Sequence, residues 1–330
     1  MAKNQRGNKL SRIVSGMWML NFAGALGLFA FFWASTIAPQ SNLGKDSPSF
    51  ESSATAMPIN PPVATLSDTF NNLPFTTIEA REYHDPATPV PNNGDWDENP
   101  KVIGYSVAGR PIEVFRFGNG PTGRMIVAGI HGGNEWNTIK LANELIKYVQ
   151  EHPEIIPENI TLYILPNLNP DGEARAHGVD GRVNDNGVDL NRNWPYRWER
   201  DYDRSSCWHY RPTTAGDYAA SEPETSALLV FIVSHPEIDA LISYHAAALG
   251  IFAGGVPDYK PSIRLAKSMA KVSTYQYPPI DVGCLYTGNL TDWASSTRDV
   301  AAVDIELHNF RHTDFDENLK ILNVFLKFKK

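Results

Sequence analysis

The stretch "RMIVAGIHGGNEW" at residues 124–136 runs from an apolar segment directly into a short glycine-rich turn. The apolar segment 124–130 has the length and composition of a buried strand. The two glycines permit a tight turn, and Asn134 is expected to cap the helix that follows. The sequence therefore predicts a strand, a turn and a helix in succession.

The same stretch also permits a metal hypothesis, in which His131 and Glu135 bind one ion. Zinc takes histidine nitrogens and carboxylate oxygens as ligands. A histidine and a glutamate four residues apart are a weak pattern when taken alone. The rest of the chain has to decide between a plain turn and a metal site.

Working outward from this stretch, strand-like and helical segments alternate along the chain. Strands are predicted at 112–118, 124–130, 160–170, 238–245 and 299–307, and helices at 135–152, 222–235, 261–274 and 315–328, with a long turn-rich stretch at 171–220. Such alternation indicates an α/β domain with helices on both faces of the sheet. His131, His245 and Glu306 all lie at or near predicted strand ends, where sites form in such sheets.

The composition is that of a globular protein with an unusual start. The chain has 330 residues, 42% of them hydrophobic, and a net charge of −8. The first twelve residues contain four basic residues and no acid; without these four, 25 basic and 37 acidic residues leave −12. A domain this acidic argues against nucleic acid as a partner.

An apolar run at 13–38 follows the basic start. As a helix it would reach about 39 Å, more than the hydrocarbon core of about 30 Å. We expect residues 1–38 to be an uncleaved single-pass anchor with a cytoplasmic N-terminus, and the rest of the chain to be extracytoplasmic. A cleaved signal peptide and a secreted protein are the alternative.

Two further regions follow the apolar run. Residues 39–100 are rich in Ser, Pro and Asn and are expected to form a polar linker, with the catalytic domain at 101–330. The only two cysteines are Cys207 and Cys284. Outside the cytoplasm such a pair can be oxidised, although two free buried thiols are an equal alternative.

The candidate residues fit the needs of a zinc hydrolase, which uses three protein ligands and an open position for water. His131, Glu135 and His245 are the candidate ligands. Glu306 is the candidate base that takes a proton from the water. It lies in the apolar segment "AAVDIELHNF", where an unpaired carboxylate would be costly.

Two arginines in the loop 167–194 are candidates for binding negative charge. Arg192 lies between two asparagines and suits an anionic group of a substrate, because a guanidinium grips a carboxylate with two parallel hydrogen bonds. Arg182 could face the oxyanion that develops when water attacks a carbonyl.

Together these segments resemble the zinc metallocarboxypeptidases of the carboxypeptidase A type. The similarity runs from about residue 103 to the C-terminus, and the matching segments appear in the family order: "GIHGGNEW", "NPDG", "GVDLNRNW", "SEPET", "ISYH", "TDW" and "DIEL". The resemblance implies a three-layer α/β/α sandwich around a mixed, largely parallel sheet of eight strands.

The resemblance also implies a role for each candidate. One zinc ion would be bound by His131, Glu135 and His245. Arg182 would stabilise the oxyanion, Asn191 and Arg192 would bind the terminal carboxylate, Glu306 would be the base, and Tyr286 would close over the substrate. The loops of Cys207 and Cys284 would both border the mouth of the site, which makes a disulfide between them an expectation.

Several positions depart from the family pattern. The ligand spacing is one residue longer than usual, and we expect Glu135 rather than Asn134 to bind the metal. The segment before "TDW" is about two residues short, which affects Tyr286. Thr291, at the position that helps to set side-chain preference, is neither large and apolar nor acidic, and so disfavours a strict preference for Lys or Arg. His308 has no implied role.

The sequence therefore predicts a monomeric zinc-dependent carboxypeptidase that hydrolyses the last peptide bond of peptides with a free C-terminal carboxylate. A zinc-activated water and Glu306 as general base would perform the reaction, and only the N-terminal segment would contact a membrane. Three alternatives stay open: a peptidase or amidase acting on cell-wall peptides, a zinc-dependent deacylase of N-acyl amino acids, and an inactive surface module that binds peptides.

Overall fold

The computed structural model describes residues 96, 99–202, 213–247, 250–281 and 283–330. The predicted anchor at 1–38 and nearly all of the predicted linker at 39–100 lie outside the described residues, as does Cys207. Within the described ranges, no helix is long and apolar enough to cross a membrane. All of the described residues belong to the unit Thr76–Lys330.

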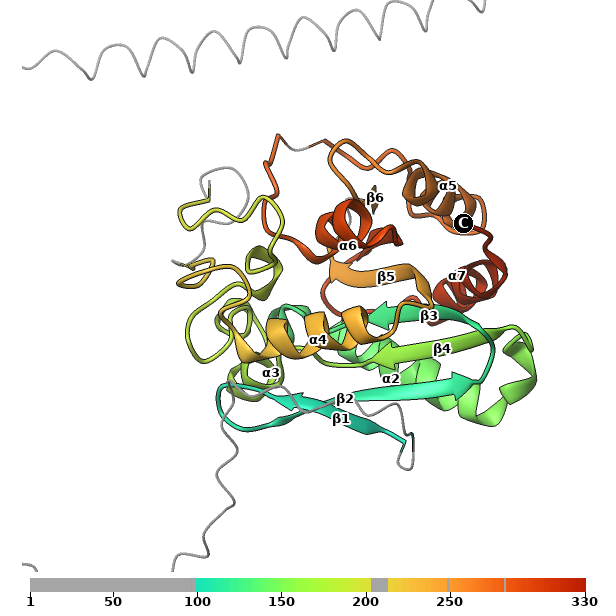
Figure 1. The fold of residues 1–330 in the computed structure, drawn as a ribbon, viewed down its shortest axis with the longest axis horizontal. Coiled ribbons are helices and arrows are strands. Elements are labelled where there is room, and N and C mark those ends of the chain that lie inside the picture. Colours follow the sequence, from blue (N-terminus) through green and yellow to red (C-terminus); the bar gives the residue numbers. More distant parts are fainter. Residues whose placement is uncertain (1–95, 97–98, 203–212, 248–249, 282) are drawn as a thin grey trace, which may run out of the picture. The chain divides into compact units, whose positions relative to one another are not determined.

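A mixed sheet organises the described part of the chain (Figure 1). Its seven strands there are β1 (Lys101–Tyr105), β2 (Pro111–Gly118), β3 (Thr122–Val127), β4 (Ile160–Leu165), β5 (Ile238–Ala246), β6 (Ile251–Ala253) and β7 (Ala301–Leu307). Their order is β1-β2-β4-β3-β5-β7-β6. The central four strands, β4, β3, β5 and β7, run parallel, whereas β1, β2 and β6 pair antiparallel. The predicted α/β class is confirmed, with seven strands in place of the expected eight.

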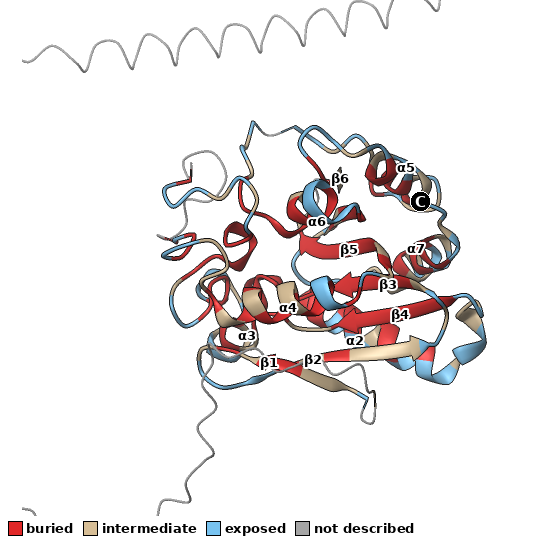
Figure 2. Cartoon of the chain, in the orientation of Figure 1, coloured by how far each residue is buried: buried red, intermediate tan, exposed pale blue. Residues whose placement is uncertain are grey.

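Helices cover both faces of this sheet and make it a three-layer sandwich. One face is covered by α2 (Trp136–Glu151), α5 (Lys260–Ala270) and α7 (Phe315–Lys327), and the other by α4 (Pro223–Ser234) and α6 (Leu290–Arg298). A shorter helix, α3 (Pro170–Arg175), lies in the long loop after β4. Figure 2 shows that the strands between the two helical layers are buried over most of their length.

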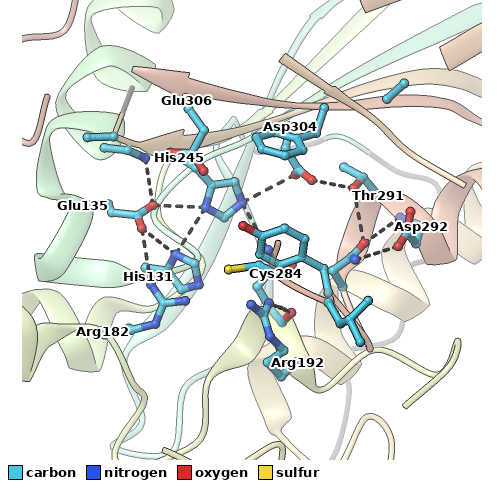
Figure 3. Close-up of a pocket in the computed structure, with 18 of the residues that line it drawn as sticks. His131, Glu135, Arg182, Arg192, His245, Cys284, Thr291, Asp292, Asp304 and Glu306 are labelled. Atoms are coloured by element: carbon cyan, nitrogen blue, oxygen red, sulfur yellow. Dashed lines mark hydrogen bonds and ion pairs between the residues drawn. The ribbon is translucent and has the colours of Figure 1, made fainter. Parts of the chain in front are cut away.

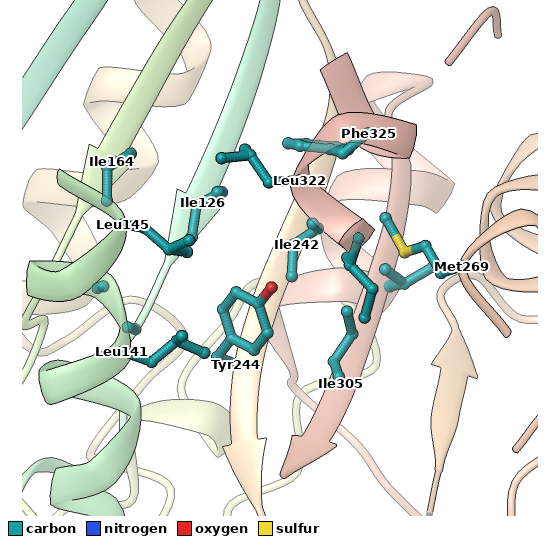
Figure 4. Close-up of a cluster of buried hydrophobic side chains, with 14 of the residues drawn as sticks. Ile126, Leu141, Leu145, Ile164, Ile242, Tyr244, Met269, Ile305, Leu322 and Phe325 are labelled. Carbon is teal, nitrogen blue, oxygen red and sulfur yellow. The ribbon is translucent and has the colours of Figure 1, made fainter. Parts of the chain in front are cut away.

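Alternation along the strands supplies a separate core for each face. On β3, Ile126 belongs to the cluster under α2, α5 and α7, whereas Met125 and Val127 belong to the cluster under α4 and α6. Figure 4 shows the first cluster, in which Leu145 of α2 lies beside Ile126 and Leu141 lies beside Tyr244. These apolar contacts hold the parallel strands in register, and the register sets the positions of the side chains at the strand ends.

The turn after β3 differs from the prediction at its cap. The chain forms a short 3-10 helix, η1 (Gly132–Glu135), before α2 begins at Trp136. Asn134 therefore lies inside a helical turn, and its side chain caps neither helix. Gly133 is required here, because a Cβ atom would lie 2.0 Å from the carbonyl oxygen of Ala176. The close approach of the segment after α3 thus explains the glycine pair.

Candidate active site

Two of the parallel strands, β3 and β5, bring the candidate metal ligands together. His131 follows β3, Glu135 ends η1, and His245 lies next to the last residue of β5. All three side chains are buried, and their ligand atoms lie within 4.8 Å of one another. The metal pair predicted in the turn and the histidine predicted at a strand end therefore form one cluster.

The atoms of this cluster converge as a metal site requires. Nδ1 of His131 lies 2.7 Å from one carboxylate oxygen of Glu135, and Nδ1 of His245 lies 3.1 Å from the other. The two Nδ1 atoms are 3.2 Å apart. Two imidazole nitrogens and a carboxylate that face one another at these distances match the ligand preference of zinc. The residues present therefore fit the expected ion.

Asp189 supports the cluster from behind and was given no role in the sequence analysis. Its Oδ1 lies 3.2 Å from Nε2 of His131. Its Oδ2 accepts a hydrogen bond of 2.9 Å from Nε of Arg182 and forms an ion pair of 2.9 Å with Nη2 of the same side chain. A carboxylate on the far nitrogen of a ligating histidine fixes the orientation of the ring. The only signal in the sequence was the position of Asp189 within the quoted segment "GVDLNRNW".

The carboxylates of this cluster are stabilised in their charged form. Burial alone would raise the pKa of Asp189, but the charges of Arg182 and His131 outweigh it and hold that pKa well below its ordinary value. For Glu135, burial is likewise opposed by His131 and His245, which lower its pKa. Both acids are therefore negative at neutral pH, as a ligand and its support must be.

Arg182 lies against the metal cluster, as predicted. It follows η3 (Val179–Gly181) and is buried, and its Nη1 lies 3.5 Å from a carboxylate oxygen of Glu135. Its hydrogen bond and its ion pair with Asp189 hold the guanidinium in one orientation. The positive charge is thereby fixed beside the candidate metal ligands.

Asn191 and Arg192 belong to η4 (Leu190–Arg192), which Asp189 caps by accepting from the backbone N–H of Asn191. Nδ2 of Asn191 lies 3.3 Å from Nε2 of His245. The guanidinium of Arg192 lies 5.3 Å from the ring of Tyr202 and 5.2 Å from that of Tyr286. Its Nε has no hydrogen-bond partner in the described part of the chain, so this donor stays available.

Strand β7 contributes two carboxyl groups, Asp304 and Glu306, which pair in register with Ser243 and His245 of β5. Oε2 of Glu306 is buried and has no hydrogen-bond partner among the described residues. Burial, together with the charges of Glu135 and Asp304 and against that of His245, raises the pKa of Glu306 to about 8. Burial also raises the pKa of Asp304, against the opposing charge of His245.

All eight predicted site residues line a single cavity of about 440 Å³. Figure 3 shows how they lie: His131, Glu135 and Arg182 occupy one end, Thr291, Asp292 and Asp304 lie toward the other, and His245 lies between them. Tyr286 is half-buried and lines the cavity beside Phe252, whose ring centroid is 5.9 Å from its own. The structure thus brings the predicted residues together, while their roles remain predictions.

Cys284 also lines this cavity and is disulfide-bonded. The other half of the predicted pair, Cys207, lies outside the described residues. The resemblance to a carboxypeptidase fold correctly indicated that the segment around Cys284 borders the site. His308, which had no implied role, instead binds Asp314 through its Nδ1 at 2.8 Å.

The chain belongs to the zinc carboxypeptidase family, whose model matches residues 99–321. Mouse (Mus musculus) carboxypeptidase A1 is 28% identical over 228 residues, which cover 59% of this chain and 53% of that protein. The chain spans about half the length of the curated relatives it matches. The family assignment agrees with the buried cluster of His131, Glu135 and His245 as a possible zinc site.

Solved structures share the fold at low sequence identity. Thrombin-activatable fibrinolysis inhibitor is 20% identical with a TM-score of 0.58, covering 69% of this chain and 68% of that chain. A murein-tripeptide amidase from Escherichia coli O157 is 22% identical with a TM-score of 0.51, covering 72% of this chain and 95% of that chain. These similarities show that the chain shares its fold with both proteins.

Proposed function

We propose that this protein is a zinc-dependent carboxypeptidase that hydrolyses the C-terminal peptide bond of peptides. One observation carries the proposal: a single cavity combines three convergent metal ligands with a carboxylate oxygen and a guanidinium nitrogen that have no hydrogen-bond partner among the described residues. A metal-binding module without catalysis would need neither Glu306 nor Arg192 in these states.

Arg192 and Asn191 would bind the terminal carboxylate of the substrate. The Arg192 guanidinium lies between two aromatic rings, and its Nη1 donates to the backbone oxygen of Asn191 at 2.7 Å. These contacts hold the planar group in place while Nε stays available. A pre-positioned guanidinium loses little side-chain entropy on binding a carboxylate, and this favours substrates with a free C-terminus.

Glu306 would move the protons of the reaction. When bound, the zinc ion supplies a Lewis acid that lowers the pKa of water and polarises the scissile carbonyl. Glu306 lies opposite His245 in the strand register. The positive charge of a bound ion would favour its ionised form, and its Oε2 would accept the proton of the attacking water. It then returns this proton to the leaving amine. Arg182, fixed by Asp189, would stabilise the oxyanion from the other side.

The proposal is tested with the full-length chain, supplied with zinc, on matched peptides that end in a free carboxylate or in an amide. We expect rapid loss of the C-terminal residue from the free acids and a strong drop for the amides, because the amide cannot pair with Arg192. Equal cleavage of both would contradict the proposal.

The same assay separates the alternatives that the sequence left open. Cleavage of cell-wall peptides alone would support the amidase, and cleavage of N-acyl amino acids alone would support the deacylase. Binding of peptides without turnover in the zinc-loaded protein would support the inactive module.

We further propose that the catalytic domain lies outside the cytoplasm. The proposal rests on the apolar run at 13–38 and on the basic residues that precede it. Protease treatment of intact cells that express the full chain should remove the domain and leave a small N-terminal fragment in the membrane. A full-length chain protected from the protease would contradict this topology, and a soluble form starting near residue 39 would indicate a cleaved signal peptide.

A further inference from the structure

Asp304 is a half-buried acid of the cavity, and the proposed reaction assigns it no role. It precedes Glu306 by two residues on β7 and therefore faces the same side of the sheet. Its Oδ2 accepts a hydrogen bond of 2.7 Å from the hydroxyl of Thr291. Its Oδ1 is buried and has no hydrogen-bond partner among the described residues. An oxygen that faces a cavity in this state can accept from a ligand.

The nearest group that can carry a positive charge is the imidazole of His245, whose Nε2 lies 3.6 Å from Oδ1 of Asp304. That distance is too long for a hydrogen bond. Nε2 has a closer oxygen in the hydroxyl of Ser243, at 3.1 Å. The hydroxyl of Ser243 therefore orients His245, and it also lowers the pKa of Asp304 through a side-chain hydrogen bond. Neither neighbour brings a positive charge within hydrogen-bond distance of Oδ1.

Charge is divided between the two ends of the cavity. Two buried arginines, Arg182 and Arg192, lie at the metal end, and the exposed Arg197 lies at the rim. Three aspartates also line the cavity, Asp258, Asp292 and Asp304, and of these Asp304 lies 3.6 Å from Nε2 of His245. Figure 3 shows Asp292 and Asp304 on the far side of His245 from Glu135.

Among these three acids, Asp304 is the one suited to contact a substrate. The Asp292 carboxylate is already used, because it accepts from the backbone N–H of Gly255 at 2.8 Å and from Nδ2 of Asn289 at 2.8 Å. Asp258 lies in the turn before α5 and is mostly exposed to solvent. A charge in water contributes less to binding than one in a desolvated site.

The proposed binding mode brings a substrate side chain to this end of the cavity. A terminal carboxylate at Arg192 and a scissile carbonyl at the metal ligands leave the C-terminal side chain to occupy the remaining walls. These walls include Ala253, Gly255, Thr291 and Asp304. The small residues leave room, and the carboxylate is the strongest acceptor there.

We propose that Asp304 makes the site select a C-terminal residue with a cationic side chain, Lys or Arg; this inference rests on the proposed carboxypeptidase function. An ammonium or guanidinium group would give the free oxygen a charge-assisted hydrogen bond. A neutral side chain would leave the buried carboxylate unpaired. Thr291, which by itself disfavoured such a preference, instead orients the selecting acid through its hydroxyl.

The test compares substrates that differ in charge and hardly in shape. The full-length, zinc-loaded protein is assayed on peptides ending in Arg or citrulline, and in Lys or norleucine. We expect kcat/KM to be at least about tenfold higher for each cationic member. Asp304→Asn should bring both ratios close to about one, mainly by lowering the cationic values. Asp316→Asn, the same charge change on exposed α7 surface, should leave the ratios unchanged.

Zinc content, measured on the same preparations, separates selection from support of His245. Equal kcat/KM for the charged and neutral members in the unaltered protein would overturn the proposal without any variant. The proposal would also be overturned if Asp304→Asn lowered kcat/KM equally for all four substrates and lost zinc. Failure of the carboxypeptidase function itself looks different, because then no peptide with a free C-terminus would be cleaved.

Discussion

The carboxyl groups of the site fall into two pairs: Asp189 and Glu135 share their oxygens with histidine and arginine side chains, whereas Glu306 and Asp304 on β7 each keep an oxygen that has no hydrogen-bond partner among the described residues. The charges differ accordingly. The pKa values of the first pair are lowered by their cationic neighbours, and those of the second pair are raised by burial. One cavity thus holds buried carboxyl groups in two opposite states.

The two pairs of acids also differ in the segments of the chain that contain them. Glu135 lies in the turn after β3, and Asp189 lies in a long loop with short helical turns, η3 and η4. Hydrogen bonds and ion pairs between polar groups fix both acids. Asp304 and Glu306 both lie on one strand, β7, which is fixed by its neighbours in the sheet. An unpaired buried carboxylate costs free energy, so its survival on a rigid strand indicates a functional group.

The largest effect on turnover is expected when Glu306, the proposed base, is replaced by an uncharged residue. Glu306→Gln should lower kcat about 100- to 10,000-fold, because the amide cannot accept the proton of water. Zinc content should not change, since Glu306 is not a candidate ligand. A variant with near-normal kcat would show that the base lies elsewhere.

Replacing Glu135, one of the two paired acids, should instead weaken metal binding. Glu135→Gln should weaken zinc retention by more than about 100-fold, the upper range for losing a second-sphere partner. Asn134→Ala is the matched control, because Asn134 neighbours Glu135 in η1 and its Nδ2 has no hydrogen-bond partner in the described structure. Zinc is measured after dialysis against a chelator. Loss of zinc from the Asn134 variant, with zinc kept by the Glu135 variant, would show that Glu135 is not the ligand.

A smaller effect is expected one contact further from the ion. Asp189→Asn should lower zinc affinity about 10- to 100-fold, because the amide supports His131 less well and no longer neutralises Arg182. Turnover at saturating zinc should fall less than in Glu306→Gln. Competition with a metallochromic chelator measures the affinity. Unchanged affinity would mean that Asp189 serves the fold rather than the metal site.

These contrasts show what the sequence could and could not predict. Apolar periodicity identified the parallel strands and the helices α2, α4, α5 and α7, and motif order placed all eight site residues in one cavity. The short elements β6 and α6 were not predicted, because they contain too few apolar residues to show a hydrophobic periodicity.

The missed features of the site depend on contacts that are distant in sequence. The spacing of Glu135 could not reveal that η1 precedes α2, since this follows from the packing of Gly133 against Ala176. The roles of Asp189 and Asp304 could not be read either, because each depends on a partner from another segment: Arg182 for Asp189, and Thr291 for Asp304. Residue type alone does not distinguish a paired acid from an unpaired one.

Glu224 sharpens the comparison, because it is a buried acid that is fully hydrogen-bonded but has no cationic partner. It lies in the first turn of α4, where its two oxygens accept from the backbone N–H of Val107 and from Nδ2 of Asn184, both at 3.1 Å. Burial raises its pKa from 4.5 to about 7. It does not line the cavity, so Glu224→Gln should leave turnover unchanged and alter only stability.

The sign of this stability effect follows from proton binding. Between about pH 4.5 and about pH 7 the folded protein keeps the Glu224 proton that the unfolded chain releases, so the free energy of unfolding falls as pH rises. Relative to Glu224→Gln, the unaltered protein should lose on the order of 3 kcal/mol across this window. The glutamine loses one hydrogen bond, but that loss shifts the difference equally at every pH. Denaturant unfolding of both proteins from about pH 5 to about pH 8 measures the slope. A difference that stays constant over this range would mean that Glu224 is ionised in the folded state throughout, and that hydrogen bonds alone can stabilise a buried carboxylate here without a cation.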